Sequence, residues 1–301
     1  MKTKSLYPFI FGILTLVVSF SSCTKSEIDP DASGTFETTE IIVSSEGSGK
    51  LLEFNAEEGM QLEKNQIVGY IDSTQLYLKK LQLKANQKAL LSRQPDMQKQ
   101  IAVLEQQLTT ARIEKKRIEN LVKEHAVATK QLDDVNAQIA LLEKQITASK
   151  STLSTTIDGI SLDNNALGIQ LQQIEDQLQK CQISSPIEGT VLVKYAEQGE
   201  LTGTGKALFK IGDTNHMILR AYVTNDQLST IKIGQNVKVY ADYGTGNKEY
   251  TGTVTWISNK AEFTPKTIQT RDERANLVYA LKISVNNDGY IKIGMYGDVK
   301  F

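Results

Sequence analysis

Side chains suited to catalysis or metal binding are few in this sequence, which contains two histidines and two cysteines. Neither His125 nor His216 has cysteines or carboxylates spaced around it as a zinc site requires. No serine can be matched with a histidine and an aspartate to give an activated nucleophile. The sequence therefore predicts no catalytic residue, no cofactor and no metal site, and it indicates that the chain is not an enzyme.

Five residues near the N-terminus nevertheless match positions of an EF-hand calcium loop. They are Asp29, Asp31, Ser33, Gly34 and Glu40. An EF-hand needs a helix on each side of its loop. Here the upstream residues are polar and turn-rich, and residues 38–43 are typical of a strand, so we interpret the stretch as a solvated acidic linker.

The segment GTGK at residues 203–206 contains the lysine of a phosphate-binding loop without its other parts. Such a loop has a further glycine five residues before its second glycine, and a serine or threonine after the lysine. Glu200 and Ala207 occupy these two positions. The segment therefore predicts a hairpin turn.

The first residues have the layout of a secretory signal, with Lys2 and Lys4 ahead of an apolar stretch and small residues before Cys23. The apolar stretch is shorter than the roughly 20 residues of a membrane span. The ending Ser-Ser-Cys resembles a bacterial lipoprotein cleavage box. We expect residues 1–22 to be a signal peptide and Cys23 to carry a lipid, with residues 23–35 as anchor and tether. A retained N-terminal anchor or an ordinary secreted protein is the alternative.

The second cysteine, Cys181, is then the only free thiol, so no disulfide framework is expected. Cys181 continues an apolar repeat of the preceding helical segment. We interpret it as a small core residue and not as a reactive thiol.

A repeated segment organises the β-structure of the chain. Residues 44–72 and 184–213 align with Gly49 against Gly189. Each copy has short alternating apolar runs broken by glycines, typical of strands that need a partner sheet to bury one face. We expect residues 36–72 and 182–213 to be two halves of one β-module that is split by an insertion.

The insertion, residues 73–181, has almost no glycine or proline, which favours long helices. Apolar residues recur in it at alternating steps of four and three, with Lys115 as one polar exception. The first run is Met97, Ile101, Leu104, Leu108, Ala111, Ile118 and Val122, and the second is Leu132, Val135, Ile139, Leu142, Ile146, Ser149 and Leu153. These runs predict an antiparallel coiled-coil hairpin, about 70 Å long at 1.5 Å per residue, whose tip lies in residues 123–131.

Two potential interruptions, Pro95 and Gly159, lie equally far from the two ends of the insertion. We expect them at one height in the hairpin, where the rod bends or loosens. Beyond Gly159 the apolar steps shift, which indicates a four-residue stutter. Two unrelated helix defects are the alternative.

Residues 214–301 return to short strands and predict a small β-barrel, with Trp256 and the tyrosines in its core or at its rim. The 34 basic and 35 acidic residues nearly balance, which argues against a nucleic-acid partner. Together these patterns predict an α+β multidomain chain, in which a β-module is split by a long antiparallel α-helical hairpin and followed by a small β-barrel.

This arrangement resembles the HlyD/MacA-type periplasmic adaptor proteins, also called membrane fusion proteins, over about residues 36–301. The most specific stretches are residues 184–205 and 261–285, and the second, with the ending IGMYGDVKF, is similar to the branch that serves ABC transporters. The resemblance implies a lipoyl-like barrel-sandwich hybrid (36–72 and 182–213), the hairpin (73–181) and the barrel (214–301).

The same resemblance implies a periplasmic location, with the lipid anchor in the cell membrane, more specifically the inner one. It implies an adaptor of a tripartite efflux or secretion pump that joins an inner-membrane ABC-type transporter to a TolC-like outer-membrane channel. The adaptors would form a homo-oligomer, a hexameric ring or a trimer of dimers. The cargo cannot be read from the sequence.

In the family, the hairpin tip carries an Arg, a Leu four residues later and a Ser shortly before a Leu-Asp pair. The segment RIENLVKEHAVATKQLDD supplies Arg117 and Leu121 for the first two. Ala128 stands at the Ser position and Thr129 follows it, so the hydroxyl contact departs from the family pattern. The alternative for Arg117 is a solvated charge beside the heptads.

Two other classes of protein are weighed against this one. A biotinyl or lipoyl carrier would need a modified lysine on a tight hairpin between the two β-halves, and here the helical insertion replaces that hairpin. A coiled-coil envelope lipoprotein that only scaffolds would share the signal and the rod. Neighbouring genes for an ATPase and a permease would distinguish the adaptor from the scaffold.

Overall fold

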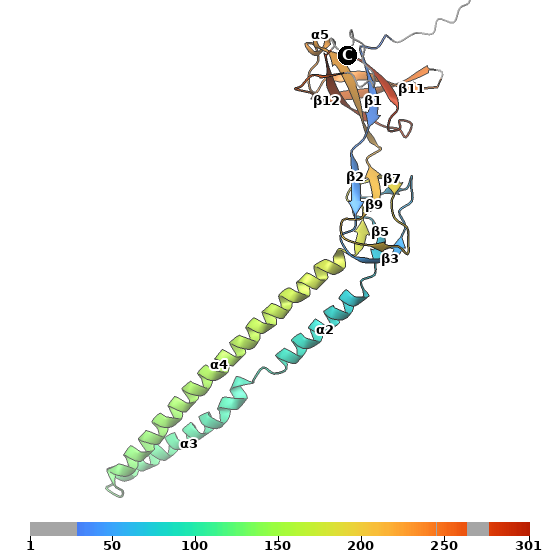
Figure 1. The fold of residues 1–301 in the computed structure, drawn as a ribbon. Coiled ribbons are helices and arrows are strands. Elements are labelled where there is room, and N and C mark those ends of the chain that lie inside the picture. The colour runs from blue at the N-terminus through green and yellow to red at the C-terminus, as the bar shows by residue number, and fades with distance from the viewer. Residues whose placement is uncertain (1–28, 245, 264–276) are drawn as a thin grey trace, which may run out of the picture. The chain divides into compact units, whose positions relative to one another are not determined.

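A computed structural model describes residues 29–244, 246–263 and 277–301. The chain forms two compact units (Figure 1). The first comprises residues up to Ile41 together with Gly212–Phe301, and the second is Ile42–Ile211. The C-terminal segment therefore shares its unit with the residues that precede the β-module.

The first unit contains a closed six-stranded antiparallel barrel. Its strands are β1 (Ala32–Glu37), β10 (His216–Thr224), β11 (Asn236–Tyr243), β12 (Gly246–Ile257), β14 (Leu277–Asn286) and β15 (Tyr296–Lys300). They pair in the order β10-β1-β15-β11-β12-β14, and the pairing of β10 with β14 closes the barrel. A short strand β13 (Glu262–Phe263) adds to β14, and a short helix α5 (Asn225–Leu228) follows β10.

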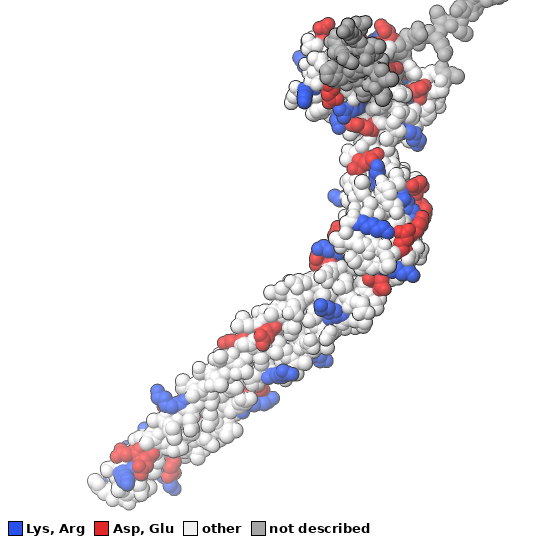
Figure 2. All heavy atoms as spheres, in the orientation of Figure 1, with Lys and Arg blue, Asp and Glu red and all other residues white. Residues whose placement is uncertain are grey.

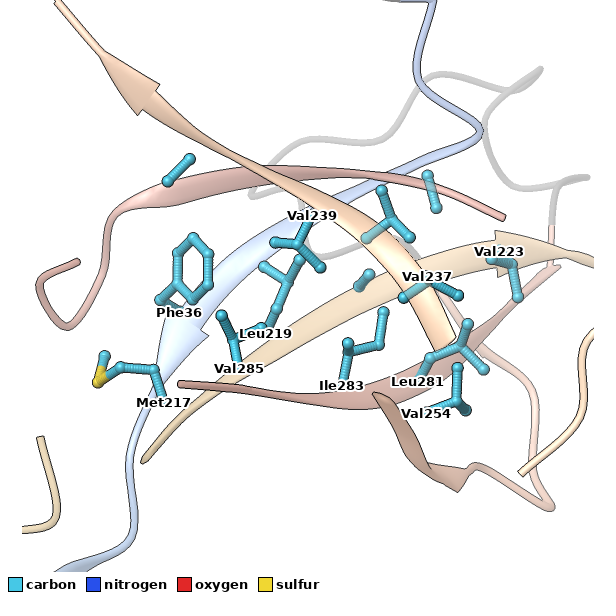
Figure 3. Packing of buried hydrophobic residues seen from close by; sticks show 14 of the residues in the cluster. Phe36, Met217, Leu219, Val223, Val237, Val239, Val254, Leu281, Ile283 and Val285 are labelled. Carbon is cyan, nitrogen blue, oxygen red and sulfur yellow. The ribbon is translucent and has the colours of Figure 1, made fainter. Parts of the chain in front are cut away.

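The barrel core is built by alternation along each strand, since successive strand residues face opposite sides. In β10 every second residue is buried, among them Met217, Leu219 and Val223 (Figure 3). They meet Phe36 of β1 and the buried side of β14. Each such large apolar side chain contributes about 1.5–3 kcal/mol on burial. The small barrel expected from the sequence is confirmed.

The start of the barrel differs from the expected boundaries. Residues 32–37 were assigned to the tether and to the first β-half, yet β1 lies between β10 and β15 with Phe36 only 1% exposed. Gly34 faces β10 so closely that an added Cβ would lie 2.0 Å from the Arg220 carbonyl oxygen. The interpretation of this stretch as a solvated acidic linker is corrected as well, because residues 32–37 and 40–44 are strands.

Three tyrosines pack around one lysine at the rim of the barrel. The Lys248 ammonium lies 5.9, 5.4 and 5.7 Å from the ring centroids of Tyr243, Tyr250 and Tyr290. It also pairs with Asp288, which accepts a hydrogen bond from the Tyr250 hydroxyl. The bond from Lys248 is the main cause that lowers the pKa of Asp288 to about 2.

The second unit contains the β-module, built from eight short strands. They are β2 (Glu40–Ser44), β3 (Gly49–Phe54), β4 (Gln61–Leu62), β5 (Ile67–Ile71), β6 (Gln182–Ser184), β7 (Gly189–Lys194), β8 (Leu201–Thr202) and β9 (Ala207–Gly212). They form two four-stranded sheets in the orders β2-β9-β7-β4 and β6-β5-β3-β8.

The two halves of the module are interleaved. Gly49 of β3 pairs with Thr202 of β8, and in the equivalent place Gly189 of β7 pairs with Leu62 of β4. Each sheet thus takes strands from both sides of the insertion. Their buried side chains, such as Leu51 and Phe209, are fully enclosed. Neither half can bury its apolar face without the other.

Three helices form the insertion: α2 (Thr74–Leu91), α3 (Met97–Lys123) and α4 (Thr129–Gln179). The 51 residues of α4 span about 77 Å. The first arm, α2 and α3, packs against α4, and three ion pairs join the arms: Lys80–Glu175, Glu105–Lys150 and Arg112–Glu143. In each pair the two residue numbers add up to 255. The arms are therefore antiparallel, with one register from base to tip.

Every position of the two expected apolar runs is buried or half-buried. The core between α3 and α4 is formed by Ile101, Leu108, Leu142 and Ile146. The expected stutter is also present, since the second buried position of the heptad, occupied by Leu142, moves one residue along the heptad to Leu171 and Leu178, which are half-buried. No helix in the described ranges is both long and apolar enough to cross a membrane.

The expected interruption occurs in one arm only. Residues 92–96, which include Pro95, break the first arm between α2 and α3, and Asp96 begins α3 by accepting a hydrogen bond from the Lys99 amide. The expectation for Gly159 was wrong, because α4 runs through it without a break. A glycine costs a helix about 1 kcal/mol, which packing along a long helix offsets, whereas a proline also removes a donor and clashes with the preceding turn.

Candidate docking site at the hairpin tip

The tip of the hairpin is a tight loop closed by a Schellman motif at the end of α3. The Leu121 carbonyl accepts a hydrogen bond from the Ala126 amide at 2.9 Å, and the Val122 carbonyl accepts one from the His125 amide at 3.0 Å. His125 takes the left-handed conformation that this motif requires, with φ of 57°. The loop therefore fixes the last turn of α3, which carries Leu121.

Because L-residues are strained in this conformation, His125→Gly is expected to stabilise the hairpin or leave it unchanged. His125→Val is expected to destabilise it by about 1–2 kcal/mol, since a β-branched side chain is poorly tolerated at positive φ. Thermal unfolding followed by circular dichroism at 222 nm checks both variants. Equal stability of the glycine and valine variants would contradict this account of the tip.

The other side of the loop begins α4 without a side-chain cap. Ala128 is the N-cap residue, with φ of −72° and ψ of 141°, and it offers no side-chain acceptor to the helix. Thr129 is the first helical residue and is exposed. Ala128, which the sequence analysis aligns with the family's serine, is thus an N-cap, where a hydroxyl would bond the second or third amide of the helix.

We expect Ala128→Ser to raise the free energy of unfolding of the hairpin by about 1 kcal/mol, because serine is a favoured N-cap and alanine is not. The backbone at Ala128 already has the extended conformation that an N-cap adopts. Thermal or urea unfolding of the two proteins measures the difference. A destabilised serine variant would show that the hydroxyl cannot reach the helix amides.

Arg117 and Leu121 both project from the last turns of α3. The Arg117 side chain is 69% exposed and its guanidinium lies 2.6 Å from the Glu114 carboxylate, while Leu121 is 37% exposed. Between them, Ile118 is 7% exposed and takes the place in the seam against α4. The residues expected at the tip are therefore available for contact with a partner. Neither Arg117 nor Leu121 is needed for the packing of α3 against α4.

Glu114 was missed in the sequence, although its spacing from Arg117 was readable. A carboxylate three residues before an arginine on a helix meets it on the same face. This surface ion pair contributes little to stability. It does orient the guanidinium along the helix surface, and basic and acidic side chains lie side by side at the tip in Figure 2.

The other candidate residues do not converge on a site. The His216 imidazole Nδ1 lies 2.9 Å from the Asp213 carboxylate, and the described ranges contain no group of three His, Cys, Asp or Glu side chains that could hold a metal. The GTGK segment forms the expected turn, with the Lys206 amide donating to the Gly203 carbonyl at 3.0 Å. Cys23 lies outside the described residues.

Cys181 is a core residue, as expected. It is 4% exposed, and burial raises the pKa of its thiol, so the unreactive protonated form is favoured. It lies beside a cavity of about 750 Å³ at the base of the hairpin. Asp72, another residue of this cavity, already accepts hydrogen bonds from the Thr74 amide and hydroxyl, which lower the pKa of its carboxyl.

No family model matches the chain. The UPF0194 membrane protein YbhG of Salmonella paratyphi B and that of Salmonella newport are each 37% identical to it over 125 residues. The match covers 41% of this chain and only 38% of the length of these relatives.

Solved structures match a larger part of the chain. MacA from Actinobacillus actinomycetemcomitans covers 89% of this chain with a TM-score of 0.50 and 20% identity, and the match covers 76% of MacA. A MacA–MexA chimera with the Pseudomonas aeruginosa MexA α-hairpin domain gives a TM-score of 0.51 at 20% identity, covering 89% of this chain and 78% of the chimera.

The chain shares the fold of MacA, and its resemblance to the membrane fusion proteins is confirmed.

Proposed function

We propose that the chain is the periplasmic adaptor of a tripartite efflux or secretion pump. It would join an inner-membrane transporter of the ABC type to a TolC-like outer-membrane channel. The observation that supports this best is the combination of an interleaved β-module, a closed barrel and a rod of about 77 Å that ends in an exposed tip. A rod of this length has no role in a carrier domain and is suited to bridging a distance.

Each part has a role in this proposal. The β-module is the lipoyl-like barrel-sandwich hybrid, the barrel (214–301 with β1) faces the transporter, and Arg117, Leu121, Ala128 and Thr129 meet the channel or a neighbouring adaptor. Several copies form a ring, hexameric or a trimer of dimers. The chain carries no cofactor and moves its cargo without covalent chemistry.

The proposal is tested by purifying the protein from membranes with its anchor intact and identifying the proteins that accompany it. A copurifying permease and ATPase would support the adaptor. Purification without any transporter, together with unchanged export in a deletion strain, would favour an envelope scaffold lipoprotein instead.

We also propose that Cys23 carries the lipid that holds the protein at the inner membrane, facing the periplasm. Cys23→Ser is then expected to move the folded protein from the membrane fraction to the soluble periplasmic fraction, because no acyl chain remains to bind the bilayer. Fractionation and intact-mass measurement check this. A variant that stays in the membrane with the mass of wild type, corrected for one oxygen in place of sulfur, would point to a retained apolar anchor.

A further inference from the structure

The tyrosine cluster at the rim of the barrel has the walls of a cation-binding cage. Tyr243, Tyr250 and Tyr290 surround one point. At that point the Lys248 ammonium lies between 5.4 and 5.9 Å from each ring centroid. The Asp288 carboxylate closes a further side and pairs with the same ammonium. We name the three tyrosines and Asp288 the tyrosine cage. Aromatic faces together with a carboxylate attract ammonium cations, through the ring quadrupole and the opposite charge.

The walls of the cage are held in place by contacts that do not involve the lysine. The Tyr290 hydroxyl donates to the Asp242 carbonyl at 3.1 Å, and its amide donates to the Asp288 carboxylate at 3.2 Å. The Tyr250 hydroxyl donates to the same carboxylate at 3.0 Å, and its ring packs against the barrel core. The ring centroids of Tyr243 and Tyr290 are 4.5 Å apart. The cage therefore keeps its shape when the lysine leaves, and a preformed site loses little free energy in ordering its residues.

The loop that carries Asp288 and Tyr290 is fixed from its other side as well. The Asn287 side-chain oxygen accepts a hydrogen bond from the Gly289 amide at 3.1 Å. Its side-chain nitrogen donates to the Thr214 carbonyl at 2.8 Å. Half of the cage is thus held in place by contacts outside the hairpin between β11 and β12, which carries the other half.

The lysine is the one side chain at this point that is free to leave. Lys248 lies on β12 at the end of a flexible four-carbon stem, and its side chain is 39% exposed. Tyr243 beside it is 52% exposed, so the cage opens to water. After displacement the ammonium is hydrated, and Asp288 keeps two hydrogen-bond donors, the Tyr250 hydroxyl and the Tyr290 amide. A cation that replaces the lysine also replaces its charge, so no buried charge is left without a partner.

The distances in the cage suit a cation larger than a lysine ammonium. A methyl carbon packs on an aromatic ring at about 3.5–4.0 Å, and a single C–N bond adds about 1.45 Å. The nitrogen of a methylated ammonium in contact with the rings therefore lies about 5–5.5 Å from them. The Lys248 nitrogen lies at a similar distance from all three rings, 5.4 to 5.9 Å, and carries hydrogens in place of methyl groups.

We propose that the tyrosine cage is a binding site for small organic ammonium cations, above all quaternary ones, and that Lys248 is a resident occupant which the ligand displaces. All residues of the site belong to one barrel, so the inference does not depend on the proposed adaptor function. The lysine competes as an intramolecular ligand, with an effective concentration on the order of millimolar. The cage of the unaltered protein therefore responds only to high concentrations of the cation.

Binding is tested by titrating the purified full chain with tetramethylammonium chloride, against sodium chloride at equal ionic strength. The methyl proton resonance of the cation is expected to move upfield on binding, because the ring faces shield it. Lys248→Gln empties the cage and should tighten binding at least ten-fold. In that background Asp288→Asn should weaken binding at least ten-fold and Tyr243→Leu should reduce the shift. Tyr296→Leu is the matched control, since Tyr296 is 74% exposed on β15 outside the cage. No shift with the Lys248→Gln protein, or equal effects of the two leucine variants, would overturn the proposal.

Acylation of lysines in the unaltered protein gives a second readout that needs no variant. Acetic anhydride modifies amines that are free of ion pairs, and mass spectrometry of peptides gives the rate at each lysine. We expect saturating tetramethylammonium to raise the rate at Lys248 several-fold, because the lysine then leaves Asp288. Lys238 is the matched control, since it pairs with Glu249 at 2.9 Å across the same two strands but lies outside the cage. An unchanged rate at Lys248, or equal acceleration at both lysines, would contradict displacement by the cation.

Discussion

Arg117→Asp is expected to abolish export while changing the free energy of unfolding by less than about 0.5 kcal/mol, as exposed substitutions usually do. The side chain is 69% exposed and its only ionic partner in the described ranges is Glu114, one turn away on the same helix. The loss of that pair costs the fold little. A reversed charge at a contact with a channel or a neighbouring adaptor is costly, because like charges are then brought together as water leaves.

Lys116→Asp is the matched control, because it makes the same change of charge one residue away and about 100° around α3. Export by both variants is measured against a deletion strain, and unfolding is measured on the purified proteins. Normal export by Arg117→Asp would retire the docking role of the tip. Equal loss in both variants would instead indicate a general effect of charge on the rod.

Two further variants refine this test. Leu121→Ser should lower export strongly, since it removes a half-exposed apolar side chain beside the Schellman motif. Thr129→Ala should have a small effect if the family's serine position is Ala128. A large effect would mean that the hydroxyl contact has moved to Thr129.

Replacement of residues 74–180 by a short Gly-Ser linker is expected to leave a soluble protein that melts cooperatively and exports nothing. The ends of the cut are already neighbours: Tyr70 pairs with Gln182, and the Ile71 amide donates to the Cys181 carbonyl at 2.8 Å. The interleaved strands keep their partners in the absence of the rod. Calorimetry and an export assay measure the two outcomes, and an aggregated product without a transition would contradict an independently folding module.

A shortened hairpin tests the length of the rod separately from the presence of the tip. Deletion of residues 98–111 and 144–157 removes two heptads from each arm. The two deleted segments face each other, because their end residues pair as 98 with 157 and 111 with 144, and each pair of numbers adds up to the 255 that defines the register. The rod becomes about 21 Å shorter, with Arg117, Leu121 and the loop intact. We expect a folded protein that does not export, and normal export would show that length is not what the rod supplies.

The parts of the fold that depend on local periodicity could be predicted from the sequence. The seam of the hairpin repeats every few residues, so its buried positions and its tip follow from the order of apolar residues alone. The break at Pro95 also follows from a local property, the missing backbone donor. The N-cap at Asp96 was readable as well, since aspartate before a helical run is a common start signal.

The rest depends on pairings between residues far apart in the chain. Nothing within residues 32–37 specifies that they pair with 216–224 and 296–300, because a short alternating strand fits any sheet with a free edge. The tip illustrates a different limit. Its loop is set by the left-handed backbone of His125, a conformation more typical of glycine, and so the sequence showed a polar stretch but not the Schellman motif that ends α3.

The interruption at residues 92–96 has a mechanical consequence. The ion pair Lys80–Glu175 on the base side of the interruption and the ion pair Glu105–Lys150 on its tip side keep the same register. The five residues of the interruption therefore span the same length along the rod as the part of α4 that faces them. Over that height a single helix bears any sideways load, whereas two packed helices share it elsewhere. The rod therefore consists of two stiff segments joined by a more flexible one. A sideways force at the tip bends the rod at residues 92–96, whereas the length from base to tip is fixed by the continuous helix α4.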